Sequence, residues 1–159
     1  PELEQIFMQH QILHEDQLER CLENACNYDE LFLIAQEYQN LSVEFMTTHI
    51  DKLDWFIVSN SQLMDIEFLT NNANNILWKY LPLNNRMAPY IHNGFISMFR
   101  NTGIFDNIGF TDVDIDTILE YKENMTEKSV ESILENHDDI TDEQMKQLNS
   151  IKSTLHAES

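Results

Sequence analysis

Turn-forming residues are scarce in this chain, and this scarcity limits the folds that it can adopt. Its 159 residues include only three glycines and three prolines. All-β folds use both residues heavily, because glycine reaches backbone angles that other residues avoid and proline fixes φ at a turn value. Apolar residues instead recur at helical spacing along most of the chain. We therefore predict an all-α protein, an irregular antiparallel bundle of about seven to nine short helices.

Aromatic and charged residues are distributed unevenly, which divides the chain into a centre and two arms. Residues 52–105 contain nine of the sixteen aromatic residues and carry a net charge of +1. The arms, residues 1–51 and 106–159, each carry a net charge of −10. A chain of this length can bury a core without disulfides or metals. We predict a helical core domain over residues 1–105 and an acidic three-helix subdomain, residues 106–159, packed on it.

The C-terminal third contains a regular helix-start pattern. Thr111, Thr126 and Thr141 are fifteen residues apart, and each follows an apolar residue and precedes an acidic one. Apolar residues also stand four and seven positions after each threonine. This is a hydrophobic staple, in which threonine caps the helix and the preceding residue packs on the fourth helical position. The pattern predicts three short helices, at about 112–124, 127–136 and 142–155. Looser versions around His14 and Asn27 indicate a similar construction in the N-terminal arm.

Smaller signals predict where other helices begin and end. Asn27 and Glu30 have the N-x-x-E spacing of a capping box, and Ser42 is placed to cap the next helix. Gly103 is a candidate left-handed C-cap for a helix in the centre. Gly94, inside that helix, either lets another helix approach closely or is simply a tolerated weak position.

Cysteine usage and the N-terminal residues bear on the compartment. At helical spacing Cys21 and Cys26 point about 140° apart, so they cannot readily pair. We interpret them as buried small apolar residues in a reducing compartment. The first residues are acidic and lack the basic start and apolar core of a signal peptide. No apolar run exceeds about five residues, which is too short to cross a membrane. These features predict a cytoplasmic protein.

A ladder of carboxylates is the main candidate for a functional surface. The net charge of −19 repels nucleic acid and anionic lipid and attracts basic partners. Carboxylates four residues apart lie side by side on a helix and cost a few tenths of a kcal/mol per pair. Such a row is either a solvated face or a docking surface for basic side chains. The predicted partner-binding residues are Asp112, Asp116, Glu120, Glu123, Glu127, Glu131, Glu135, Asp139 and Glu143.

Two further patterns resemble sets of metal ligands, but each lacks part of its motif. Positions 1, 3, 5, 9 and 12 of a calcium-loop pattern would be Asp112, Asp114, Asp116, Glu120 and Glu123. However, position 6 is Thr117 rather than glycine, and Ile115 and Ile118 belong to a predicted helix core. His10 and His14 have the i, i+4 spacing of helical ligands but no accompanying ligand motif. No catalytic or nucleotide-binding fingerprint is present. We predict no metal, no cofactor and no catalytic residue.

These observations predict a non-enzymatic binding protein that docks a basic protein surface. An inhibitor, an immunity protein, an assembly chaperone or a nucleic-acid mimic would fit, and the partner could itself be a nucleic-acid-binding protein. The alternative is a structural or assembly subunit, homo-oligomers included, that buries the exposed aromatic residues Trp55, Trp78 and Tyr90 of the centre. A metal- or calcium-binding protein is a remote alternative.

Overall fold

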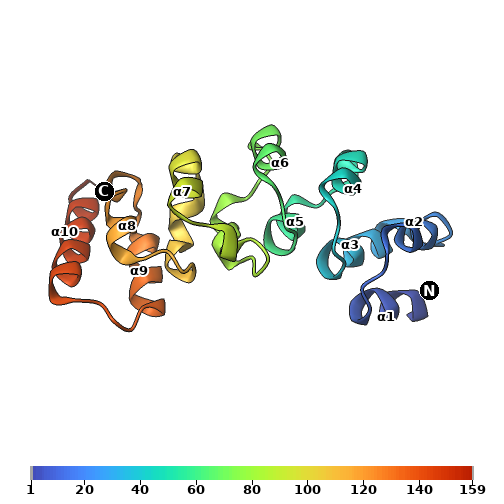
Figure 1. The fold of residues 1–159 in the computed structure, drawn as a ribbon, viewed down its shortest axis with the longest axis horizontal. Coiled ribbons are helices and arrows are strands. Elements are labelled where there is room, and N and C mark those ends of the chain that lie inside the picture. Colours follow the sequence, from blue (N-terminus) through green and yellow to red (C-terminus); the bar gives the residue numbers. More distant parts are fainter. Residues whose placement is uncertain (1, 159) are drawn as a thin grey trace. The chain divides into compact units, whose positions relative to one another are not determined.

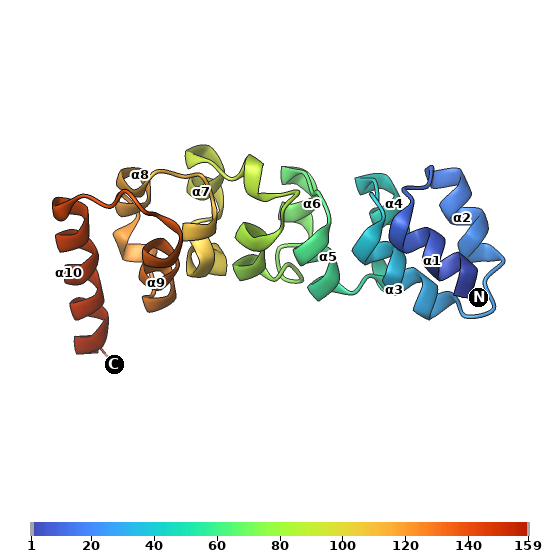
Figure 2. The same ribbon diagram turned by 90° about the horizontal axis from the view of Figure 1, so that it is seen from below.

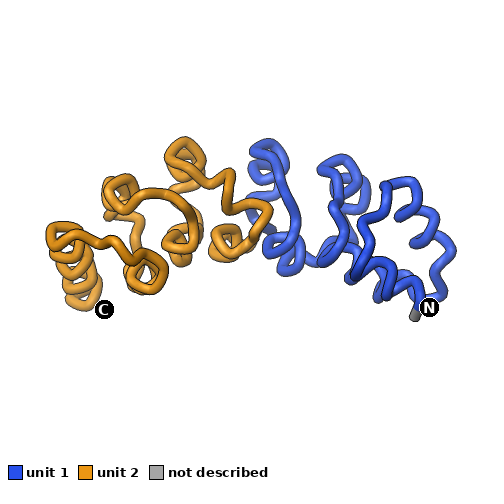
Figure 3. The backbone as a smooth tube through the Cα atoms, turned by 60° about the horizontal axis from the view of Figure 1, so that its bottom comes forward, with its two compact units in different colours: residues 1–76 blue, residues 77–159 orange. Residues whose placement is uncertain are grey.

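The computed structural model describes residues 2–158, which form an all-α fold (Figure 1). The protein is 70% helical, and the described residues contain no strand. Among residues 2–158, eight helices span seven residues or more. The predicted fold class is confirmed, with the expected number of main helices. The chain divides into two compact units, unit 1 (residues 1–76) and unit 2 (residues 77–159), coloured in Figure 3.

The helices of each unit are short. Unit 1 contains α1 (Glu2–His10), α2 (Glu15–Glu23), α3 (Tyr28–Tyr38), α4 (Val43–Thr48), the 3-10 turn η1 (Ile50–Lys52), α5 (Trp55–Ser61) and α6 (Ile66–Asn71). Unit 2 contains the 3-10 segments η2 (Trp78–Leu83) and η3 (Ala88–Tyr90), then α7 (Asn93–Phe99), η4 (Gly103–Phe110), α8 (Ile115–Leu119), η5 (Lys122–Asn124), α9 (Glu127–Asn136) and α10 (Asp142–Glu158).

The main helices follow one another in pairs, each a first helix, a connecting segment and a second helix; in the η2–α7 pair the connection includes η3. The pairs are α1–α2, α3–α4 and α5–α6 in unit 1, and η2–α7, η4–α8 and α9–α10 in unit 2. Within unit 1, α3 packs against both α1 and α5; within unit 2, η4 packs against both η2 and α9 (Figures 1 and 2). Each unit is therefore a stack of three helix pairs, as in repeat proteins, where each repeat mainly contacts its neighbours.

The second helix of every pair begins with the residue pattern of a hydrophobic staple. The caps are His14, Ser42, Asp65, His92, Asp114 and Thr141. The preceding apolar residues are Leu13, Leu41, Met64, Ile91, Val113 and Ile140. The residues four positions after the caps are Leu18, Met46, Leu69, Ile96, Ile118 and Met145; the first five are buried and Met145 is half-buried. The same local residue pattern thus marks the start of the second helix in each pair.

Two of the three predicted threonine caps are confirmed. Thr126 Oγ1 accepts a hydrogen bond from the Ser129 amide at 3.3 Å, and α9 follows directly. Thr141 Oγ1 accepts one from the Gln144 amide at 3.1 Å, and α10 follows. The cap at Ser42 is confirmed as well, with the Phe45 amide 2.9 Å from Ser42 Oγ, and α2 begins directly after His14 as predicted.

The third threonine cap is wrong. The buried Thr111 hydroxyl donates to the Ile108 carbonyl at 2.7 Å and so closes the end of η4. Asp114 caps the following helix instead. The single helix predicted at about 112–124 is replaced by the short α8 and the separate turn η5.

Several smaller predictions also need correction. Asn27 precedes α3, but its side-chain amide donates to the Glu30 carboxylate instead of forming a capping box. All three glycines are described and none has a positive φ, so Gly103 is not a left-handed cap; it begins η4. Cys21 is half-buried and Cys26 is exposed, so the two are not both buried.

The predicted domain boundary between residues 105 and 106 falls inside η4. The compact units instead divide between Ile76 and Leu77, so the aromatic centre is shared between them. In unit 2, the buried Trp78 ring lies 4.7 Å from the Phe99 ring, between their centroids. In unit 1, the half-buried Trp55 ring lies 6.0 Å from that of Phe68.

A buried glutamine joins the first two helix pairs of unit 1. Gln39 is fully buried, and its Nε2 donates to the Met8 and Gln11 carbonyls at 2.6 and 2.8 Å. Its Oε1 accepts from the Leu13 amide at 2.8 Å. The last carbonyls of a helix have no partner within the helix. The side chain of Gln39 therefore supplies hydrogen-bond partners both for the C-terminal end of α1 and for the loop that follows it.

Gln62 repeats this arrangement one pair further along the chain. Its Nε2 donates to the Gln36 and Gln39 carbonyls at 2.6 and 2.7 Å, and its Oε1 accepts from the Leu41 amide at 3.0 Å. It too is fully buried. The two glutamines set the register between consecutive pairs of unit 1, and neither was singled out in the sequence.

Gly109 lets η4 pack directly on α9 in unit 2. A Cβ atom at Gly109 would lie 2.2 Å from the carbonyl carbon and oxygen of Ser132, and 2.4 Å from the Ile133 nitrogen. The Gly109 amide donates to Ser132 Oγ at 3.0 Å. The close approach considered at Gly94 is not made there, because a Cβ would meet only the His92 ring, at 3.1 Å.

Substitution of Gln39 by leucine should destabilise unit 1 by about 3 kcal/mol, because a buried backbone group left without its hydrogen bond costs roughly 1–3 kcal/mol. The free energy of unfolding in urea, followed by circular dichroism, measures the change. Gln9→Leu, at an exposed position of α1, is the control and should lie within about 0.5 kcal/mol of the native protein. If the two variants changed the free energy of unfolding equally, the hydrogen bonds of Gln39 would not be what stabilises unit 1.

Substitution of Gly109 by alanine should destabilise unit 2 by at least about 2 kcal/mol, because the added methyl overlaps the α9 backbone. Gly103→Ala is the matched control, since a Cβ there would have ordinary contacts beginning at 3.6 Å. Urea unfolding of both variants tests the expectation, and a neutral Gly109→Ala variant would show that η4 and α9 do not pack this closely.

Candidate partner-binding surface

The nine predicted carboxylates all belong to unit 2, and all are exposed. Asp116 lies on α8, Glu123 in η5, Glu127, Glu131 and Glu135 on α9, and Glu143 on α10; Asp112, Glu120 and Asp139 lie in the connecting segments. None of the nine pairs with a lysine or arginine within the part of the chain that the structure describes. Their negative charge is therefore directed to solvent rather than neutralised within the fold.

Helix α9 presents three of these carboxylates in a row. Glu127, Glu131 and Glu135 share one face because they are four residues apart. Val130 and Ile133 are fully buried on the other side, which fixes the rotation of the helix. We call these three carboxylates the α9 ridge. At its N-terminal end, Glu127 Oε1 lies 2.7 Å from His156 Nε2, which forms an ion pair when the histidine is protonated.

A groove runs beside the α9 ridge, between η2, η4 and α9. Its cavity volume is about 350 Å³, and we call it the η4 groove. Its lining includes Lys79, Tyr80, Asp106, Phe110, Glu131 and Glu135. Phe110, predicted to pack as a staple residue, is instead 43% exposed. Two carboxylates of the predicted ladder thus meet aromatic surface here, a combination that suits a cationic side chain.

Hydrogen bonds hold the walls of the η4 groove in place. Asn107 Nδ2 donates to the Lys79 carbonyl at 2.7 Å, which joins η4 to η2. Thr126 Oγ1 donates to Asp106 Oδ1 at 2.7 Å, which joins the start of α9 to η4. Lys79 Nζ lies 5.1 Å from the centre of the Tyr80 ring. The groove therefore has defined walls rather than loose side chains.

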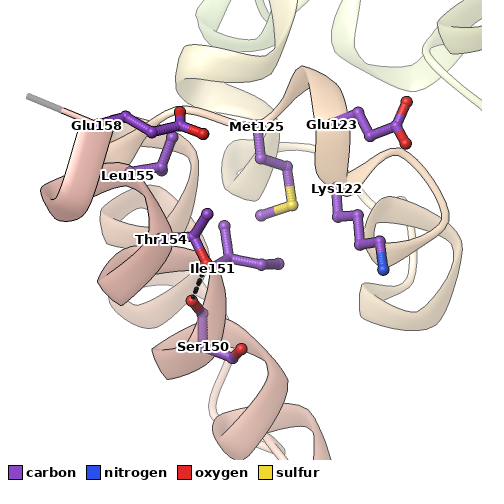
Figure 4. A pocket seen from close by; sticks show the side chains of 8 residues that line it. All are labelled: Lys122, Glu123, Met125, Ser150, Ile151, Thr154, Leu155 and Glu158. Atoms are coloured by element: carbon purple, nitrogen blue, oxygen red, sulfur yellow. Dashed lines mark hydrogen bonds between the residues drawn. The ribbon is translucent and has the colours of Figure 1, made fainter.

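A second groove of unit 2, about 470 Å³ in volume, lies between α10 and residues 122–125 (Figure 4). Met125 and Ile151 face one another across it, and the charged ends of Lys122, Glu123 and Glu158 point outward around it. Glu123 is thus apart from the η4 groove. The structure brings Glu131 and Glu135 together at one groove but places Glu123 at another.

The calcium-loop pattern falls on a helix start. The Asp114 carboxylate accepts hydrogen bonds from the amide and the hydroxyl of Thr117, at 2.9 and 2.7 Å. Ile115 and Ile118 are buried within the same short helix. No group of three or more histidine, cysteine or acidic side chains among residues 2–158 is arranged to hold a metal ion. His10 ends α1 and His14 caps α2, both exposed.

Neither a family model, nor a characterised protein, nor a solved structure matches this chain. Within the described residues, no helix combines the length and apolar character needed to cross a membrane.

The hydrogen bonds from Thr117 hold the pKa of Asp114 below its ordinary value, with the side-chain bond contributing most. A lowered pKa means that this contribution to stability is present above the unfolded-state pKa and is lost as the pH falls through the folded-state pKa. Asp114→Ala should therefore cost about 1 kcal/mol at neutral pH, as for other caps. The cost should shrink below about pH 4.

Urea unfolding at pH 7 and pH 3 measures this difference. Asp112→Ala, an exposed carboxylate two residues away, removes the same charge without removing a cap and should have little effect at either pH. A cost for Asp114→Ala that is equal at both pH values would show that the carboxylate form is not what stabilises α8.

Proposed function

We propose that this protein is a non-enzymatic binding protein whose α9 ridge and η4 groove dock a basic protein surface. The observation that carries the proposal is the exposure of nine unit 2 carboxylates without a lysine or arginine partner among the described residues. Three of them line one face of a helix that borders a groove with aromatic walls. An inhibitor, an immunity protein, an assembly chaperone or a nucleic-acid mimic would use such a surface.

The chemistry of the η4 groove specifies what the partner would insert. An arginine or lysine side chain has an apolar stem and a cationic end. The stem would lie against Phe110, and the cation would meet Glu131 and Glu135. Lys79 and Lys128 also line the groove and would oppose the inserted cation, so the attraction there depends on Asp106, Glu131 and Glu135 together. The net charge of −19 would speed the encounter with a basic protein and repel nucleic acid and anionic membranes.

We also propose that the protein works in a reducing, cytoplasmic compartment. Cys26 is an exposed free cysteine, and exposed thiols persist mainly where the environment is reducing.

The first test is to find the partner by capture at low salt, elution with a salt gradient and mass spectrometry, and then to measure the affinity of the purified pair. Changing Glu127, Glu131 and Glu135 together to glutamine should weaken binding on the order of tenfold and flatten its salt dependence, because three interfacial charges are lost.

A matched variant separates the α9 ridge from net charge. Glu19, Glu44 and Glu67 are exposed carboxylates of α2, α4 and α6 in unit 1, and changing all three to glutamine removes the same charge. This control should alter affinity by less than about threefold. Binding that is insensitive to salt, or equally weakened by both triple variants, would refute docking through the α9 ridge.

A second candidate function is that of an assembly subunit, and exposed apolar residues favour it. In unit 2, Tyr90 and Met98 are 57% and 58% exposed, and in unit 1 Phe56 is 54% exposed. Two of the aromatic residues first considered for this role contribute less, because Trp78 is buried and Trp55 is half-buried. Loss of partner binding on changing Tyr90 and Met98 to serine, with the α9 ridge triple variant unaffected, would favour this function.

A further inference from the structure

The η4 groove carries charges of both signs. Three carboxylates line it, those of Asp106, Glu131 and Glu135, together with the two ammonium groups of Lys79 and Lys128. Three negative and two positive groups leave the lining with a net charge of −1. One monovalent cation therefore neutralises the groove, whereas a group of several cations would leave it positive.

The two lysines do not neutralise the carboxylates themselves. Neither Lys79 nor Lys128 forms an ion pair among residues 2–158. Lys79 Nζ lies instead 5.1 Å from the centre of the Tyr80 ring. Asp106 is held in place by the Thr126 hydroxyl, which donates to its Oδ1 at 2.7 Å. The carboxylates of the groove are therefore open to an incoming cation.

An exposed aromatic ring lies at the same groove. Phe110 is 43% exposed and lines the groove, and no lysine or arginine of the described residues lies over its ring. The preceding amide, that of Gly109, donates to Ser132 Oγ at 3.0 Å and so holds the end of η4 against α9. An open ring beside carboxylates suits a flat cation, whose face stacks on the ring while its edge donates hydrogen bonds.

The groove has room for one long side chain rather than for a segment of backbone. Its volume of about 350 Å³ is near the lower end of the roughly 300–1,000 Å³ found for small-ligand pockets. Glu131 and Glu135 are four residues apart on α9, which places their Cβ atoms roughly 5–6 Å from one another. A planar group with donors on two edges can reach both carboxylates at that separation.

We propose that the η4 groove is a pocket for one arginine side chain of the basic partner and that it selects arginine over lysine. This inference rests on the docking function proposed above and adds the identity of the inserted residue. The arginine stem and one face of its guanidinium lie on Phe110, and the guanidinium edges donate to Glu131 and Glu135. A guanidinium has five donors in a fixed fork. A lysine ammonium is a compact, strongly hydrated charge that gains less from an aromatic face.

Titration of the full chain with two blocked amino acids, N-acetyl-arginine methylamide and N-acetyl-lysine methylamide, tests the selectivity by amide NMR. The two probes carry the same charge, so the net charge of −19 attracts both equally and a difference in affinity reports the groove. The arginine probe should shift the amides of Asn107, Phe110 and Ser132, with a dissociation constant on the order of 1 mM or weaker. The lysine probe should bind there about threefold more weakly.

Four variants assign the selectivity to residues. Phe110→Leu keeps an apolar side chain but removes the aromatic face, so the two probes should then bind equally. Glu135→Gln should weaken both probes about threefold, and Lys128→Gln, which removes a like charge, should strengthen both. The control, Glu67→Gln, removes one exposed carboxylate of unit 1 and should change neither affinity. All four side chains are exposed, so circular dichroism should stay unchanged.

Equal affinity of the native protein for both probes would overturn the arginine pocket, and so would shifts confined to residues outside the η4 groove. A preference for arginine that Phe110→Leu leaves unchanged would overturn it as well. Docking through the α9 ridge is tested separately, by the salt dependence of partner binding and by the triple glutamine variant. A selective groove in a protein whose partner is insensitive to that variant would refute the docking function and not the pocket, so the two failures are distinguishable.

Discussion

Hydrogen bonding at the helix ends is the constraint on which the rest of this structure depends. Most of the helices are shorter than the 12–15 residues needed for marginal stability in water, so packing and capping must hold them. Short helices also have a high proportion of unpaired terminal carbonyls and amides. In unit 1, Gln39 and Gln62 satisfy such groups and join one helix pair to the next. The same bonds therefore complete the secondary structure and stack the pairs.

Unit 2 meets the same constraint with smaller side chains. Thr111 stands two residues before Val113, as Gln39 stands two residues before Leu41, but its hydroxyl bonds the end of its own helix, η4, whereas Gln39 follows α3 and bonds the end of α1 in the preceding pair. The Gly109 amide is satisfied by Ser132 Oγ. Small residues allow η4 and α9 a backbone approach that a glutamine between them would prevent. Gly109 and Ser132, both helical residues, thus set how closely η4 and α9 pack.

Local features of this fold could be predicted from the sequence, whereas the stack could not. A staple involves residues only five positions apart, so the caps at His14, Ser42, Thr126 and Thr141 were recognisable. The caps of the second helices fall at uneven intervals along the chain, which hides the repeat. The regular threonine spacing was misleading, because Thr126 caps a first helix, Thr141 a second helix and Thr111 neither. The bonds of Gln39 and Gln62 join residues distant in sequence, which periodicity cannot show.

The candidate site, too, could be predicted only in part from the sequence. The exposure of the α9 ridge follows from the burial of Val130 and Ile133, which a helical pattern predicts. The η4 groove joins Lys79, Phe110 and Glu131 from three separate helices, so only the stack reveals it. Among the described residues the ridge contributes only the Glu127–His156 pair, between two exposed side chains, so its charges can change at little cost to the fold.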